Sequence, residues 1–225
     1  MAMAMPEKLP AGLAADRQWY IVGRWQEFEG EGRTNLLRMI AIGAFYLVQL
    51  VNFHGVHHGA EPLAPYHRQV TLVCAAWTLL ALAILLCLQW RMFPAALKYC
   101  STGCDMLLLT TLAAARHAKD ATEGVGPSSP LLLVYFLIIA LAALRFSLGL
   151  VWFSTLGGML GYLTLVAVFD RGKWFDADHT VPPVTQLVTL LSLALTGLFV
   201  GQVVRRVKGI AQEYAQRLAE ASRKV

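Results

Sequence analysis

The sequence contains little charge. Lys, Arg, Asp and Glu make up 15% of the 225 residues, whereas hydrophobic residues make up 57% and the mean hydropathy is +0.54. A soluble domain carries about 25% charged residues, so we expect most of this chain to lie in a lipid bilayer. The net charge of +5 does not indicate nucleic-acid binding, because the basic residues are spread between apolar runs rather than gathered in one patch.

Cysteines and enzymatic motifs are also scarce. The four cysteines fall in or beside apolar runs and are typical of small buried residues rather than of a disulfide framework. The sequence has no phosphate-binding glycine loop, no HExxH, no GxSxG and no CxxCH. We therefore predict a non-enzymatic protein, and we do not expect haem, because no histidine pairs face one another within the apolar runs.

Six apolar runs have the length of membrane-spanning helices. They cover roughly residues 36–53, 70–90, 95–114, 131–146, 148–169 and 184–204. Fourteen of the 19 Lys and Arg residues fall on the inner side if the N-terminus is inside, which is the bias that the positive-inside rule demands. We predict an all-α bundle of six transmembrane helices in the bacterial inner membrane, with both termini cytoplasmic. The domains would be an N-terminal tail (1–33), the bundle (34–204) and a cytoplasmic helix (205–225).

The segment 14–31 places aromatic residues among charged ones. Trp19, Tyr20, Trp25 and Phe28 alternate there with Asp, Arg, Gln and Glu. This pattern predicts an amphipathic helix that lies in the membrane interface. The alternative is a segment before the first span whose aromatic side chains sit at the lipid headgroups.

Apolar residues continue beyond the last span at alternating spacings of four and three, which is typical of a coiled coil. No proline interrupts the pattern, so we expect the last span and the tail to form one helix and the protein to form a homodimer through this seam. The alternative is an amphipathic tail that lies on the inner leaflet. The dimer seam consists of Val204, Val207, Ala211, Tyr214, Leu218 and Ala221.

Histidine is restricted to the predicted outer loops and their edges. Imidazole is a frequent metal ligand and titrates near neutral pH. Four of the six histidines could bind Zn or Cu or report pH, although their spacing matches no strong zinc signature; the alternative is that they are tolerated interfacial residues. These four are His54, His57, His58 and His67.

Asp105 is the acidic residue that falls inside the predicted spans. A carboxylate in the membrane is costly and therefore indicates a functional or structural site. Arg145 is a candidate basic partner, and Ser101, Thr102 and Thr110 are candidate hydrogen-bonding neighbours. We interpret Asp105 as a buried polar clamp between helices, with proton or ion translocation as the alternative.

The stretch from Leu97 to Tyr162, under a third of the chain, carries a resemblance. Asp105 in its apolar run is followed by GVGPSSPLLLVYF at 124–136 and LAALRF at 141–146. This arrangement resembles the multi-span N-terminal membrane input module of bacterial sensor histidine kinases and membrane adenylate cyclases. The tail GQVVRRVKGIAQEYAQRLAE is similar to the helix that joins such modules to an output domain. The chain departs from the pattern by ending at Val225, so an output domain would lie on a longer form of the chain or on a partner.

Three functions are compatible with these patterns. The first is a non-enzymatic sensor or transducer that relays an outer-face or intramembrane stimulus to a cytoplasmic output through the last helix. The second is an accessory or scaffolding subunit of a larger membrane complex, for instance an electron-transfer or photosynthetic assembly. The third is a metal or proton carrier that uses the outer histidines and Asp105.

Overall fold

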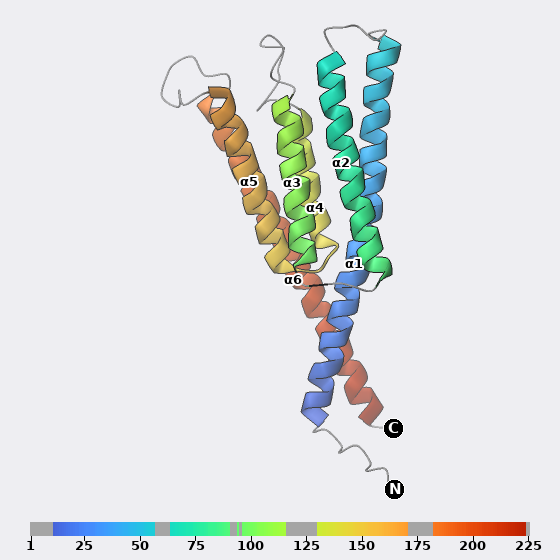
Figure 1. Ribbon diagram of the computed structural model, residues 1–225. Coiled ribbons are helices and arrows are strands. Elements are labelled where there is room, and N and C mark those ends of the chain that lie inside the picture. The colour runs from blue at the N-terminus through green and yellow to red at the C-terminus, as the bar shows by residue number, and fades with distance from the viewer. Residues whose placement is uncertain are drawn as a thin grey trace.

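The computed structural model describes residues 11–56, 64–90, 94, 96–115, 130–170 and 182–223, and this part of the chain is helical without strands. The helices run in the order that Figure 1 shows. They are α1 (Ala11–Leu50) with its π-helical continuation η1 (Val51–Val56), α2 (Ala64–Gln89), α3 (Leu97–Ala115), the short η4 (Pro130–Leu132), α4 (Leu133–Ala143), α5 (Leu148–Asp170) and α6 (Pro183–Arg223).

Four of these helices are long and apolar enough to cross a membrane. They are α2, the Glu27–Gly55 part of α1 and η1, the Leu148–Val168 part of α5 and the Pro183–Tyr214 part of α6. Helix α4 is apolar but has 11 residues, and α3 has 19 residues of which several are polar. The all-helical fold and its apolar helices are thus as predicted and indicate a membrane protein, while two of the six expected spans are represented by shorter or more polar helices.

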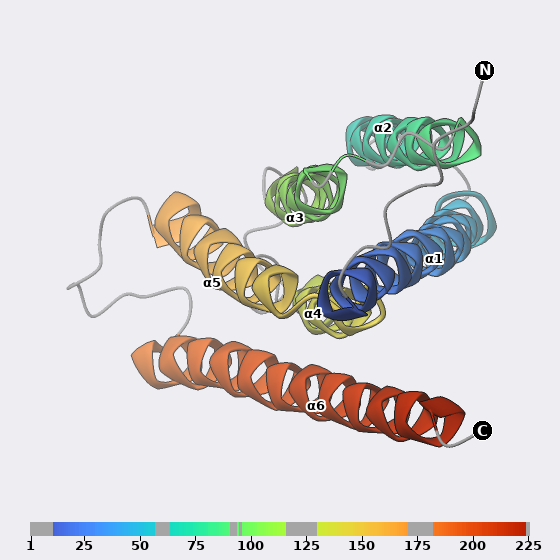
Figure 2. The ribbon, with the colours of Figure 1, turned by 90° about the horizontal axis from the view of Figure 1, so that it is seen from below.

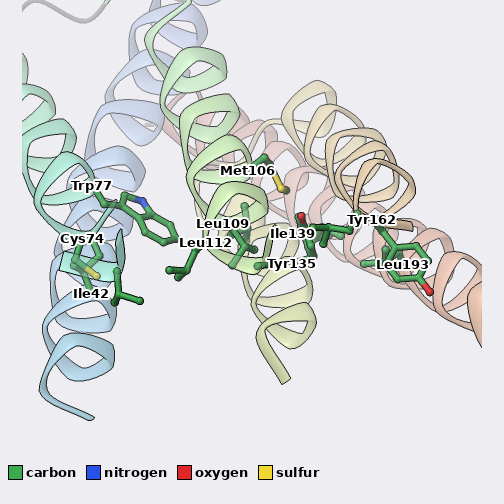
Figure 3. Packing of buried hydrophobic residues seen from close by; sticks show 14 of the residues in the cluster. Ile42, Cys74, Trp77, Met106, Leu109, Leu112, Tyr135, Ile139, Tyr162 and Leu193 are labelled. Carbon is green, nitrogen blue, oxygen red and sulfur yellow. The ribbon is translucent and has the colours of Figure 1, made fainter. Parts of the chain in front are cut away.

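The helices run alternately up and down the bundle, and α1 begins on the same side as α6 ends (Figure 1). Seen along the bundle, α4 lies near the centre, with α3, α5 and α6 around it (Figure 2). The buried cluster in Figure 3 crosses the whole bundle, from Ile42 and Trp77 on α1 and α2 to Leu193 on α6. One continuous core therefore connects the first helix with the last.

Small residues allow α5 to approach α4 closely. A β-carbon on Gly161 would lie 2.7 Å from the Tyr135 hydroxyl oxygen and 2.9 Å from Thr110 Oγ1. These two hydroxyls form a hydrogen bond of 2.6 Å between α3 and α4. The absence of a side chain at Gly161 therefore makes room for a buried polar contact that joins three helices.

Helix α1 differs from the prediction of a separate interfacial helix before the first span. It is continuous over its 40 residues, with no break at the expected boundary between residues 33 and 34. The reason is visible in its side chains: Glu31 and Thr34 are 0% and 3% exposed, so this stretch packs against other helices on one face. That packing keeps the helix on a single axis.

Helix α6 is likewise continuous over 41 residues, as expected for a last span that runs into its tail. Val204 is 2% exposed, whereas Val207 and Tyr214 are 41% and 65% exposed. The seam residue nearest the bundle is thus buried within the chain, and the next ones are uncovered. Leu218 and Ala221 belong to α6, but their side chains lie outside the described part of the chain.

Candidate functional site

Polar side chains line one face of the middle of α1. Glu27, Glu31, Asn35 and Arg38 follow one another at spacings of four, four and three, which places them on the same side of the helix. Their side chains meet polar residues of α3 and of the α4–α5 turn, and Asn35 Nδ2 also donates to the Ala81 carbonyl on α2 at 2.9 Å. The result is a charged cluster at the end of the bundle where α1 begins and α6 ends.

Arg38 and Asp105 form the first buried ion pair of this cluster. Arg38 Nε donates to Asp105 Oδ1 at 2.8 Å, and Nη2 donates to Oδ2 at 2.7 Å. Trp77 Nε1 donates a third hydrogen bond to Oδ1 at 2.7 Å, and Arg38 Nη1 donates to Asn35 Oδ1 at 2.7 Å. A carboxylate that accepts a bidentate guanidinium and an indole N–H is well satisfied away from water.

Arg145 forms the second pair from the turn between α4 and α5. Its Nη2 donates to Glu31 Oε1 at 3.0 Å, and its Nε lies 2.9 Å from Oε2. Its Nη1 donates to the Lys98 carbonyl at 3.0 Å and also to the Thr102 hydroxyl. This one side chain therefore holds α1, α3 and the α4–α5 turn together, with 2% of its surface exposed.

The turn itself has an uncommon backbone. Phe146 has a φ of 47°, in the left-handed region where a residue other than glycine is strained. Its N–H donates to the Ala143 carbonyl at 3.0 Å, and Ser147 then begins α5 by accepting from Leu150. Helix α4 ends at Ala143, and the left-handed Phe146 directly follows Arg145 in the turn that leads into α5.

Among the described residues, the charges of the cluster balance. Lys98 Nζ lies 2.7 Å from Glu27 Oε1, and Ser101 Oγ donates to Glu31 Oε1 at 3.1 Å. Each of three cations thus faces one of three carboxylates. Removing charges from water is costly, and the loss of one member of a buried pair leaves its partner uncompensated, at about 3 to 5 kcal/mol. Separating any one pair of this balanced set is therefore costly.

The structure places both predicted intramembrane polar residues in this cluster but does not pair them with each other. Asp105 pairs with Arg38, and Arg145 pairs with Glu31. The expected Asp105–Arg145 pair is wrong because the α4–α5 turn lies nearer the end of the bundle, beside the first turn of α3. The predicted hydroxyl neighbours also have other partners: Ser101 bonds Glu31, Thr102 accepts from Arg145 and Thr110 bonds Tyr135.

Four charged members of the cluster were not predicted from the sequence. Glu27 and Glu31 fell in the expected interfacial segment, and Arg38 and Lys98 were interpreted as topology signals. Glu27, Glu31 and Arg38 share one face of α1, and this face crosses the expected boundary at residues 33 and 34. A helical projection drawn across that boundary would have shown two carboxylates and one guanidinium on one stripe.

A cavity of about 120 Å³, open on one side, lies above the cluster and is lined by α1, α2, α3 and α4. One end is polar, and the residues that form it are Thr34, Arg38, Trp77, Thr102, Asp105 and Arg145. The other end is formed by apolar side chains. Those that line it include Phe45, Leu109, Leu112, Leu131, Val134, Leu137, Ile138 and Leu141.

The structure describes two of the four histidines of the predicted outer metal site, His54 and His67. Phe53 stacks on His67 with ring centroids 4.1 Å apart, and the His54 ring lies edge-on to His67 at 5.9 Å. His57 and His58 lie outside the described residues. Within the described ranges, no group of three His, Cys, Asp or Glu residues is placed to hold a metal ion. Zn or Cu binding by the four histidines thus stays a prediction.

No protein family, curated protein or solved structure matches this chain. Its function must therefore follow from its own geometry. The described part of that geometry consists of a balanced charged cluster, a cavity above it and a helix that leaves the bundle beside it.

Proposed function

We propose that the chain is a non-enzymatic membrane sensor or transducer that relays a stimulus from the outer face or the membrane interior to a cytoplasmic output through α6. In this proposal the six helices span a bacterial inner membrane and both termini are cytoplasmic. The observation that carries it is the continuity of α6, which is packed in the bundle as far as Val204 and continues as helix to Arg223.

The length of α6 supports this proposal. At a rise of 1.5 Å per residue its 41 residues extend about 60 Å, whereas the hydrocarbon core of a bilayer is about 30 Å thick. About half of the helix would then project from the membrane. A helix that crosses the boundary without a break can carry a rotation or a shift of its inner end outward.

The packing of α6 also links it to the charged cluster. Val204 packs in one buried group with Ala142, Leu150 and Val151, which flank the α4–α5 turn. Arg145 belongs to that turn and is bound to α1 and α3. A stimulus that favours a second arrangement of the cluster would displace the turn and, through it, the point where α6 leaves the bundle.

The output would be read in a dimer. The uncovered seam residues Val207, Ala211 and Tyr214 repeat at spacings of four and three beyond the bundle. The resemblance of residues 97–162 to input modules of sensor kinases and cyclases agrees with such an arrangement. An output domain or partner would then sense the relative rotation of the two α6 helices.

Cysteine cross-linking of α6 tests the proposal. The four native cysteines are replaced by alanine, and single cysteines are placed at the seam positions Val207, Ala211 and Tyr214 and at the off-seam positions Arg206 and Gln212. The expected result in native membranes is disulfide formation at the first three and little at the other two. Uniform or absent cross-linking contradicts the proposal, and foreign subunits that co-purify in fixed ratio would favour an accessory subunit instead.

A further inference from the structure

We propose that the cavity above the charged cluster binds a single-chain amphiphile with an uncharged, oxygen-bearing headgroup. The headgroup would lie beside Thr34, Arg38 and Arg145, and the chain would extend toward Leu112 and Leu131. The binding of this amphiphile does not depend on the function proposed above. Its role as the stimulus of the transducer rests on that function.

The cavity is elongated and its two ends differ in chemistry. Along α3 its lining extends from Thr102 to Leu112, ten residues or about 15 Å of helix. Arg38, Asp105 and Arg145 contribute to one end, whereas side chains from Leu109 onward are apolar. A long apolar site with a few polar groups at one end fits a chain with a single polar head.

Thr34 supplies a hydroxyl that points to a ligand. It is 3% exposed, it lines the cavity, and its Oγ1 has no hydrogen-bond partner among the described residues. A buried polar atom without a partner costs free energy, and most such atoms in proteins are satisfied. An oxygen of a bound headgroup would satisfy this hydroxyl.

The two guanidinium groups supply further donors at the same end. A guanidinium has five N–H groups, and in the described part of the chain Arg38 uses one from each of its three nitrogens, for Asp105 and Asn35. The remaining N–H groups of Arg38 can donate to a ligand that enters the cavity. The site therefore favours a headgroup with an acceptor oxygen over one that only donates.

The charge balance of the cluster indicates that this headgroup is neutral. The three cations Arg38, Lys98 and Arg145 are already matched by three carboxylates within the cluster. An additional anion or cation would remain uncompensated where the dielectric constant is low. A hydroxyl or an ester carbonyl meets the donors without adding charge.

The cavity opens toward lipid between α1 and α4. Among its lining residues, Ala41 on α1 and Leu137 on α4 are exposed, the latter by 47%. An amphiphile dissolved in the bilayer could thus enter from the side without passing through water. The ligand is expected to come from the membrane phase.

Photolabelling in lipid nanodiscs tests the site. The probe is a dodecanol analogue with a diazirine on its chain, and the competitors are dodecanol, dodecane, dodecanoate and dodecyltrimethylammonium, dosed as mole fraction of lipid. We expect saturable labelling of the lining helices and the strongest competition from dodecanol. Equal competition by dodecane, or stronger competition by either ion, would overturn the neutral oxygen headgroup. Labelling that does not saturate, as expected if phospholipid chains fill the cavity, would overturn the site.

Two pairs of variants provide matched controls. Ala41→Phe fills the mouth of the cavity and should abolish saturable labelling, whereas Ala44→Phe alters an exposed position on the same helix that does not line the cavity. Thr34→Val should weaken dodecanol binding by about 2- to 10-fold and leave dodecane unchanged. Thr111→Val removes an exposed hydroxyl that bonds its own helix and should change neither. Equal effects within either pair would contradict the proposal.

The cysteine variants of α6 separate this inference from the proposed function. If labelling is saturable and is lost in Ala41→Phe, but dodecanol leaves the cross-linking pattern of Val207, Ala211 and Tyr214 unchanged, the site stands and the transducer fails. If cross-linking follows the seam but labelling does not saturate, the binding site fails and the dimeric helix stands.

Discussion

Gly30 on α1 lies directly against the backbone carbonyl of Leu144 at the end of α4, so that a β-carbon at this position would overlap the carbonyl oxygen and lie 3.0 Å from the Cα of Arg145. The neighbouring Glu31 then reaches the Arg145 guanidinium. The close approach of two backbones is therefore a condition for the ion pair, since a wider separation would pull the carboxylate away.

Gly30→Ala should destabilise the protein by about 1 to 3 kcal/mol, because the added methyl group meets backbone atoms that cannot rotate away. Gly32→Ala is the matched control, since nothing lies within 4 Å of a β-carbon there. In the control, alanine should be neutral or stabilise the helix by up to about 1 kcal/mol. Unfolding in mixed micelles measures both, and equal midpoints for the two variants would contradict the close contact.

Arg38 and Asp105 should show strong energetic coupling. Arg38→Gln or Asp105→Asn alone leaves a buried charge unpaired and should cost about 3 to 5 kcal/mol, whereas the double variant should recover much of that loss. Combining Asp105→Asn with Arg145→Gln should give a weaker coupling than the Arg38–Asp105 cycle, because these two side chains have separate partners.

The exposed pair Arg33–Glu29, with side chains 68% and 52% exposed, is the control for this cycle. Its coupling should be about 0.3 to 0.5 kcal/mol. A cycle in which Asp105 couples more strongly to Arg145 than to Arg38 would show that the packing of α1 against α3 is different.

The helices were predictable from sequence because lipid imposes a simple requirement. In lipid, the backbone N–H and C=O groups of an apolar run must form hydrogen bonds within the protein, and a helix provides these bonds within the run itself. The predicted runs accordingly lie on α1 to α6, although α1 begins well before its run and α6 continues well beyond its run. Asp105 was recognisable for the same reason, since a lone carboxylate in such a run demands a partner.

The identity of that partner was not predictable, because it depends on how the helices are arranged. Arg38 is 67 residues from Asp105, and Glu31 is 114 residues from Arg145. The polar stripe on α1 includes Arg38, but it does not show which carboxylate of another helix Arg38 faces. The cavity is even less local, since it exists only where four helices leave space between their side chains.

Phe146 provides a test of the α4–α5 turn. Phe146→Ala and Phe146→Gly both remove the ring, so their difference in stability reports the backbone conformation. Because φ is 47° at this position, the Phe146→Gly protein should be more stable than the Phe146→Ala protein by about 1 kcal/mol. This is the reverse of the order inside a helix. Unfolding midpoints of the two variants measure this difference, and a more stable alanine variant would contradict the left-handed turn.

Gly197 and Gly209 on α6 should respond to alanine in opposite ways. A β-carbon on Gly197 would lie 2.6 Å from Cγ2 of Thr155, a residue that is 2% exposed on α5, so Gly197→Ala must separate the two helices and should cost about 1 to 3 kcal/mol.

Nothing lies within 4 Å of a β-carbon on Gly209, where alanine should strengthen the projecting helix by up to about 1 kcal/mol. Unfolding midpoints report the first effect, and helicity of the tail by circular dichroism reports the second. If α6 transmits displacement as one rigid helix, Gly209→Ala should preserve the cross-linking pattern of Val207, Ala211 and Tyr214. A pattern lost in this variant would mean that the tail must bend at Gly209 to form its contacts.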